Sequence, residues 1–65
     1  MSDLLPITLH DQISAVQREI GMRRSVYARR VGEKKMKQYT AEREIALMQA
    51  VLATLETVAA KGTTP

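Results

Sequence analysis

The sequence predicts an all-α protein: an antiparallel two-helix hairpin that dimerises into a four-helix bundle. Two long stretches carry apolar side chains at helical spacing. A short glycine-containing segment at residues 32–37 separates them, which favours antiparallel neighbours. The chain has only 65 residues and no cysteine. It therefore lacks both a large core and disulfides, so pairing with a second chain is the remaining way to stabilise it.

The first helix is expected at residues 9–31, where one apolar stripe repeats every three or four residues. Thr8 is a suitable N-cap, Asp11 follows at the capping-box position, and Ile7 stands where a hydrophobic staple would begin. Gly21 lies inside the helix, where it costs roughly 1 kcal/mol relative to alanine. It either permits a close helix crossing or is simply tolerated. The stripe consists of Leu9, Ile13, Val16, Ile20, Tyr27 and Val31.

A turn is expected at residues 32–37, with Gly32 as the C-cap of the first helix. The second helix is expected at residues 38–60, beginning near Gln38 or after Thr40 as its N-cap. It carries two apolar stripes on adjacent sides. The stripe expected to pack on the first helix is Ala41, Ile45, Met48, Leu52, Leu55 and Ala59. The stripe left in water is Leu47, Val51, Thr54 and Val58.

A helix that is apolar over so much of its circumference needs a second neighbour. Burial of a large aliphatic side chain contributes ~1.5–3 kcal/mol, whereas ordering each residue costs ~1–2 kcal/mol of backbone entropy. The contact between the two facing stripes contains about ten such side chains, so an isolated hairpin would be only marginally stable. We therefore expect a homodimer, and the residues expected at its interface are Leu47, Val51, Val58, Met22 and Val26.

Eight of the ten basic residues lie between residues 18 and 37, and two glutamates leave that segment at about +6. In a hairpin this charge gathers at the turn end. It forms either a solvated surface that favours the helix C-terminus or a partner-binding surface, since arginine and tyrosine dominate interface hot spots. Tyr27 should pack with its hydroxyl reaching solvent, and Tyr39 should be exposed. The candidate partner-binding residues are Arg23, Arg24, Tyr27, Arg30, Met36 and Tyr39.

The sequence offers no catalytic, cofactor or metal site, so we expect no enzyme. His10 is the only histidine, and neither Glu42 nor Glu44 has a nucleophile or a histidine as companion. No glycine-rich phosphate loop is present. No signal peptide is expected, because residues 1–7 lack a basic start and a long apolar core. No uninterrupted apolar run approaches ~20 residues, so we expect a cytoplasmic protein without a membrane partner.

A resemblance adds to this interpretation. It rests on Val16–Ile20, Met22–Arg24, Val26–Tyr27, Gly32, Met36 and Ala41–Leu52. Over about two-thirds of its length the chain resembles small helical-hairpin proteins of phages and prophages, a family that includes a quorum-sensing anti-activator. The resemblance implies a dimer of hairpins in the host cytoplasm that blocks a host protein, such as a LuxR-type transcription factor or a pilus-assembly ATPase. Ala28 stands where relatives tend to have proline, which would let the first helix run straighter.

The leading hypothesis is therefore a phage-encoded adaptor or inhibitor that binds a host protein through its basic, tyrosine-bearing surface. A small basic nucleic-acid-binding protein in phage gene regulation is the alternative, although two tyrosines provide little surface for base stacking. A purely structural dimerisation module is the third hypothesis. The salt dependence of binding to random duplex DNA separates the first two.

Overall fold

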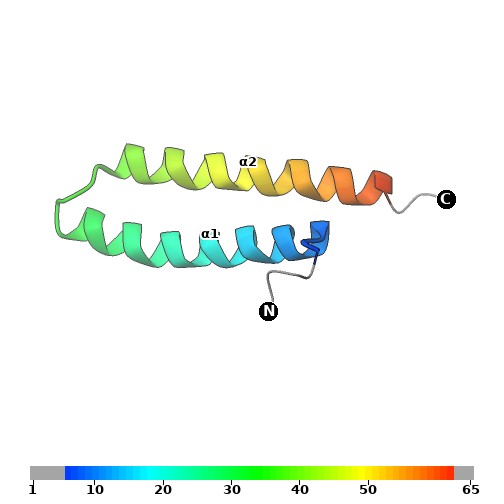
Figure 1. Ribbon diagram of the computed structural model, residues 1–65. Helices are drawn as coiled ribbons and strands as arrows, with labels where there is room; N and C mark the ends of the chain where they lie inside the picture. The colour runs from blue at the N-terminus through cyan, green and yellow to red at the C-terminus, as the bar shows by residue number, and fades with distance from the viewer. Residues whose placement is uncertain (1–5, 63–65) are drawn as a thin grey trace.

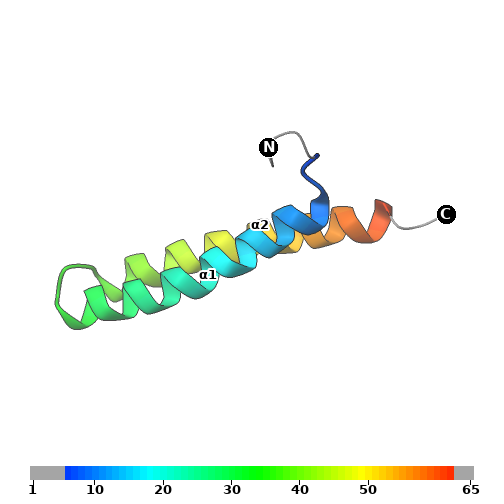
Figure 2. The same cartoon turned by 60° about the horizontal axis from the view of Figure 1, so that its bottom comes forward.

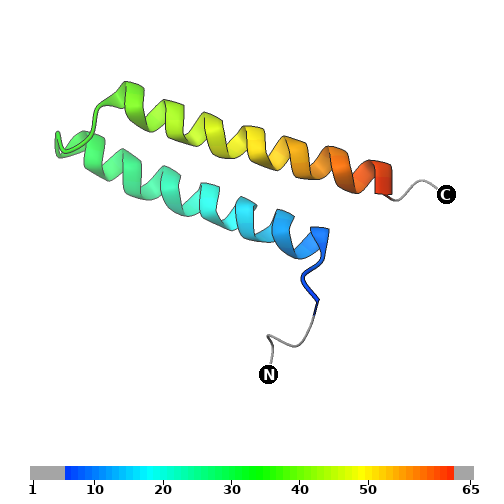
Figure 3. The same ribbon diagram turned by 45° about the horizontal axis from the view of Figure 1, so that its top comes forward.

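The computed structural model describes residues 6–62, which form two α-helices, α1 (Leu9–Gly32) and α2 (Gln38–Gly62). The helices run antiparallel and side by side, and the turn at residues 33–37 joins them at one end (Figure 1). The same pairing along the helices is visible from a second direction (Figure 3). The all-α hairpin is thus confirmed, and each predicted helix ends within two residues of the observed end.

The start of α1 is a complete capping box, as predicted. The backbone N–H of Asp11 donates to Thr8 Oγ1 at 3.0 Å, and the backbone N–H of Thr8 donates to Asp11 Oδ2 at 3.0 Å. The hydrogen bond from the Thr8 backbone lowers the pKa of Asp11. The predicted hydrophobic staple is wrong, because Ile7 remains 77% exposed. A staple needs an apolar residue at the fourth helical position, and Gln12 occupies it.

The end of α1 differs from the prediction that Gly32 is its C-cap. Gly32 is still helical, Glu33 is the C-cap, and the left-handed conformation falls on Lys34, whose φ is 59°. The Lys35 N–H donates to the Arg30 carbonyl at 2.8 Å and the Lys34 N–H to the Val31 carbonyl at 3.0 Å. These two bonds form a Schellman motif, which requires a left-handed residue directly after the C-cap. For a residue with a Cβ that conformation costs about 1–2 kcal/mol.

The contact between the helices buries little. Only Ile20 and Ala41 are buried among the described residues, each 7% exposed. The remaining members of the two predicted core stripes are half-buried, which confirms the facing sides of the helices. They are Leu9, Ile13, Val16, Tyr27 and Val31 on α1, and Ile45, Met48, Leu52, Leu55 and Ala59 on α2.

The hairpin is a single layer of two helices that is open on both sides (Figure 2). Its thinnest dimension is 11 Å, and its radius of gyration is 15.2 Å. A compact chain of this length would have a radius of gyration of about 11 Å. The accessible surface is 5330 Å², compared with about 4200 Å² expected for a compact monomer of this mass. A single layer of two helices leaves both of its broad faces uncovered (Figure 2).

Helix α2 is also long and apolar enough to cross a membrane by length and composition alone. The absence of an uninterrupted apolar run conceals this property of α2, because its few polar residues are spread along the helix. Such a property is a weak indication, since core helices of soluble proteins share it. Glu56 lies within the helix, and a carboxylate in the hydrocarbon region is costly.

Candidate protein-binding surfaces

One face of the layer carries most of the large exposed apolar side chains; we call it the apolar face. On α2 these side chains are 45–47% exposed, and on α1 they are 38% and 58% exposed. The face consists of Leu47, Val51 and Val58 from α2, and Val26 and Met22 from α1. These are the five residues predicted for the dimer interface, and each is exposed in the single chain as that prediction requires.

The charge of Glu44 relates the two helices' contributions to this face. Glu44 on α2 adds a small upward effect to the pKa of Arg23 on α1, after the larger effect of the Glu19 hydrogen bond, so the two residues lie on the same side of the hairpin. Arg23, Met22 and Val26 line the same shallow depression, so they share one side of α1. On α2, Leu47 and Val51 lie three and seven residues after Glu44, again on one side.

An ion pair lies along the α1 side of this face. Arg23 Nε donates to Glu19 Oε2 at 2.7 Å, and both side chains are partly exposed. This hydrogen bond raises the pKa of Arg23. Together with Met22, Val26 and Tyr27, the pair lines a shallow depression of about 280 Å³. The depression offers an apolar floor and a satisfied polar edge, which suits a protein side chain better than a charged ligand.

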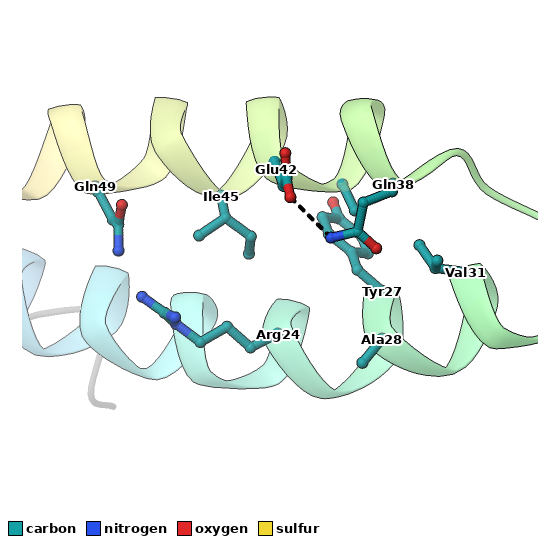
Figure 4. A pocket seen from close by; sticks show the side chains of 9 residues that line it. Arg24, Tyr27, Ala28, Val31, Gln38, Glu42, Ile45 and Gln49 are labelled. Atoms are coloured by element: carbon teal, nitrogen blue, oxygen red, sulfur yellow. Dashed lines mark hydrogen bonds between the residues drawn. The ribbon is translucent and has the colours of Figure 1, made fainter.

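The opposite face contains a groove between α1 and α2, near the turn. It has a volume of about 430 Å³. Its floor is apolar and includes Tyr27 and Val31 from α1 and Ile45 from α2, with Val31 toward the turn and Ile45 further from it (Figure 4). Arg24 and Ala28 form the α1 rim. The α2 rim is polar and consists of Gln38, Glu42 and Gln49.

The charges of the groove are distributed unevenly along it. The Gln38 amide nitrogen donates to Glu42 Oε2 at 2.9 Å, which orients the carboxylate but leaves it negatively charged (Figure 4). Arg24 extends along the groove on the side of Gln49 (Figure 4). No carboxylate among the described residues lies within ion-pair distance of Arg24. The groove therefore combines an apolar floor, several hydrogen-bonding groups and one available cation.

The turn forms a third, strongly basic surface. Lys34, Lys35 and Lys37 line a depression of about 510 Å³ together with Met36, Val31 and Gln38. Lys35 Nζ lies 3.7 Å from Glu33 Oε1, but both side chains are largely exposed, so solvent screens the ion pair. The first turn of α2 contains no acidic residue. The positive charge at this end of the hairpin therefore remains largely uncompensated.

The six residues predicted to bind a partner are distributed over several surfaces. Arg24 and Tyr27 both line the groove, whereas Arg23 lies beside the apolar face. Met36 is half-buried in the turn. Tyr39 is 74% exposed, as predicted. It follows Gln38 and lies 100° further around α2, so it points away from the groove. Arg30 is exposed near the turn.

The groove was not anticipated from the sequence, although a signal was present. Gln38, Glu42 and Gln49 are spaced by four and seven residues, so they share one side of α2. Gly21, Arg24 and Ala28 are spaced by three and four, so they share one side of α1. The polar stripe on α2 and the stripe with small residues on α1 each lie beside the core stripe of the same helix. Taken together, the two stripes indicate where the groove lies.

Between residues 6 and 62, no three histidine, cysteine or acidic side chains are grouped so that they could hold a metal ion. No protein-family model, no curated protein and no solved structure matches this chain.

Proposed function

We propose that this chain is a small non-enzymatic protein that acts as a homodimer and binds another protein through the basic end of the hairpin. The observation that carries the proposal is the separation of two exposed surfaces. The apolar face lies along the middle of the layer, and the lysine-rich turn lies at one end. A homodimer built on the first surface leaves the second one free.

The size of the apolar face supports a second copy as its occupant. A helix of 25 residues is about 37 Å long, and two adjacent helices are about 20 Å wide. Stacking two hairpins would therefore cover roughly 700 Å² on each, close to the ~800 Å² per partner of a standard specific interface. The exposed Leu47 and Val51 lie near the middle of α2, where contact would be most complete.

The charge of the hairpin supports a protein partner at the turn. Arginine and tyrosine can contribute large contact areas and bidentate pairs with carboxylates. Arg30 and Tyr39 are both exposed near the turn, beside the exposed lysines. The resemblance to small phage proteins extends the proposal to a phage-encoded adaptor or inhibitor in the host cytoplasm. A LuxR-type transcription factor and a pilus-assembly ATPase are the targets that this resemblance proposes.

The test is affinity capture from host lysate with matched baits. Tyr39→Ala and the double change Arg30→Glu with Lys37→Glu should each lose the same specific protein, while helix content and dimer mass persist. Arg18→Glu with Lys61→Glu makes the same change of charge away from the turn and should retain it. Retention by the turn variants, or equal loss in the matched control, would contradict binding at the turn.

The concentration of charge also favours a second candidate, a nucleic-acid-binding protein. Residues 18–37 carry about +6. Phosphate-driven binding weakens steeply as salt rises, with a slope that reports the number of phosphates contacted. If the protein captures no host protein and binds random duplex DNA with a slope of several units, this candidate replaces the first.

A further inference from the structure

We infer that the groove between α1 and α2 is a docking site for an amphipathic α-helix of a partner protein, with an acidic residue of that helix pairing with Arg24. The inference rests on the proposed protein-binding function and assigns it a specific structural mode. A third helix laid on two antiparallel helices meets both and turns the open layer into a three-helix unit.

The shape of the groove fits a helix. Tyr27 and Val31 are separated by one helical turn on α1, and Ala41 and Ile45 are separated by one turn on α2. An apolar stripe at positions i, i+3, i+4 and i+7 of a docked helix presents side chains at the same intervals, which is how grooves recognise helices. The floor residues are only half-buried in the hairpin, apart from the buried Ala41.

The α1 rim permits a close approach. Arg24 and Ala28 line the groove, and Gly21 lies three residues before Arg24 on the same side of α1, where the rim continues beyond the groove. Arg24 is the only long side chain among these three. A Cβ on Gly21 would meet nothing within 4 Å. The contacts inside the hairpin therefore do not require glycine there, although glycine lowers the stability of a helix interior. A partner helix lying along this rim would approach closest where side chains are smallest.

The charge on the rim selects the partner's chemistry. Arg24 has no carboxylate partner among the described residues and extends toward Gln49, away from the charged Glu42, which accepts from the amide of Gln38 (Figure 4). Arginine pairs with carboxylates in a planar, bidentate geometry. An acidic residue beside the apolar stripe of the partner helix would therefore find an available cation, and a basic residue at that place would be repelled.

The groove remains accessible in the proposed dimer, because it lies on the face opposite the apolar face. Each protomer then carries one groove, and a dimer can bind two helices. Such bivalency would strengthen binding to a dimeric or clustered partner without any new contact.

The test is selection from a displayed library of 18-residue helical peptides with a fixed leucine stripe and randomised flanking positions. The unmodified dimer should enrich aspartate or glutamate at a flanking position. Binding of a selected peptide should fall at least about tenfold on Arg24→Glu. It should change little on Arg18→Glu, a matched charge reversal outside the groove. Selection against the Arg24→Glu dimer should enrich lysine or arginine at the same position.

Gly21→Gln separates docking from folding. It should raise the melting temperature, because a better helix former replaces glycine in open space. It should also lower the affinity for the peptide, because the longer side chain obstructs the continuation of the rim. The absence of acidic enrichment, an unchanged affinity on Arg24→Glu, or equal losses on Arg18→Glu would overturn the inference. If peptides bind as expected but turn variants still capture the host protein, the groove stands and the proposed binding at the turn fails. If the turn variants lose that protein while Arg24→Glu retains it, the groove assignment fails alone.

Discussion

The two broad faces of the hairpin are built by the same two helices, but their chemistry differs. The apolar face presents aliphatic side chains that are 38–58% exposed, with one satisfied ion pair beside them. The groove face presents a half-buried apolar floor framed by glutamines, a glutamate and an arginine without a carboxylate partner among the described residues. The first face gains most by excluding water over a wide area, whereas the second offers directional contacts to a particular ligand.

This difference would let a very small chain separate the self-association and the recognition that we propose. Adjacent sides of a helix are reached by shifting the sequence pattern by one or two positions. Leu47 and Val51 belong to one face, whereas Gln49 between them belongs to the other. A 25-residue helix can thus contribute to the contact within the hairpin, to the apolar face and to the groove at the same time.

The largest expected effect comes from breaking the apolar face. Leu47→Glu with Val51→Glu should lower the dimer affinity by more than about 1000-fold or unfold the protein, because burying unpaired charges costs about 3–5 kcal/mol. Ala46→Glu with Ala50→Glu introduces the same charges one position earlier, on an exposed part of α2, and should keep the dimer. Sedimentation equilibrium measures both. If the two double variants dissociate equally, the apolar face has no special role.

Loss of the α1 N-cap should have a moderate effect that leaves the difference between the faces intact. Thr8→Ala removes a side-chain acceptor from the capping box and should destabilise the protein by about 1 kcal/mol. For a domain of this size the melting temperature should fall by about 4–8 °C. Thermal unfolding followed by circular dichroism measures the change. A loss of dimerisation free energy much larger than this loss of folding stability would mean that the cap contributes to the dimer interface, which would contradict the account.

Relief of strain at the turn should have a smaller effect of opposite sign. Lys34→Gly places glycine in the left-handed position and should stabilise the hairpin by about 0.5–1 kcal/mol, after the added chain entropy offsets part of the gain. Chemical denaturation measures it. Lys37→Gly serves as a control, since the residue just before α2 has no positive φ, and should give no such gain. A destabilising Lys34→Gly would show that the Lys34 side chain contributes a contact.

The smallest expected effect is a loss of stability in acid. The hydrogen bonds from Thr8 hold the pKa of Asp11 below its ordinary value of 3.8. The folded form therefore gains stability above that value and loses it as pH falls through the lowered pKa. Asp11→Asn should flatten this part of the pH dependence in thermal unfolding between pH 5 and pH 2. An equally steep decline in the variant would assign the acid sensitivity to other carboxylates.

Much of the fold follows from the sequence because helical periodicity and capping are local. The spacing of the apolar residues identified the facing sides of both helices, the exposed Leu47 and Val58, and the exposed Tyr39. The capping box at Thr8 was equally local. Gly32 was misleading because its conformation depends on where the Schellman hydrogen bonds close, and they close two residues later at Lys34.

The candidate binding surfaces were less predictable because they depend on how two helices combine. The arginines at positions 23 and 24 are adjacent in sequence, yet one lies beside the apolar face and the other in the groove. Their separation follows from the 100° rotation per helical residue, but assigning each to a face requires the second helix. Only the antiparallel pairing shows that Arg23 lies on the same side of the hairpin as Glu44, whereas Arg24 extends toward Gln49 (Figure 4).

The central claim, that the apolar face is covered by a second copy, is tested most directly by the mass of the unmodified protein in solution. Sedimentation equilibrium at micromolar concentration should give a folded species of twice the chain mass of 7.3 kDa. Dilution should bring dissociation and loss of helix together, because one seam holds a single hairpin only marginally. A stable, folded monomer over the same concentration range would contradict the claim.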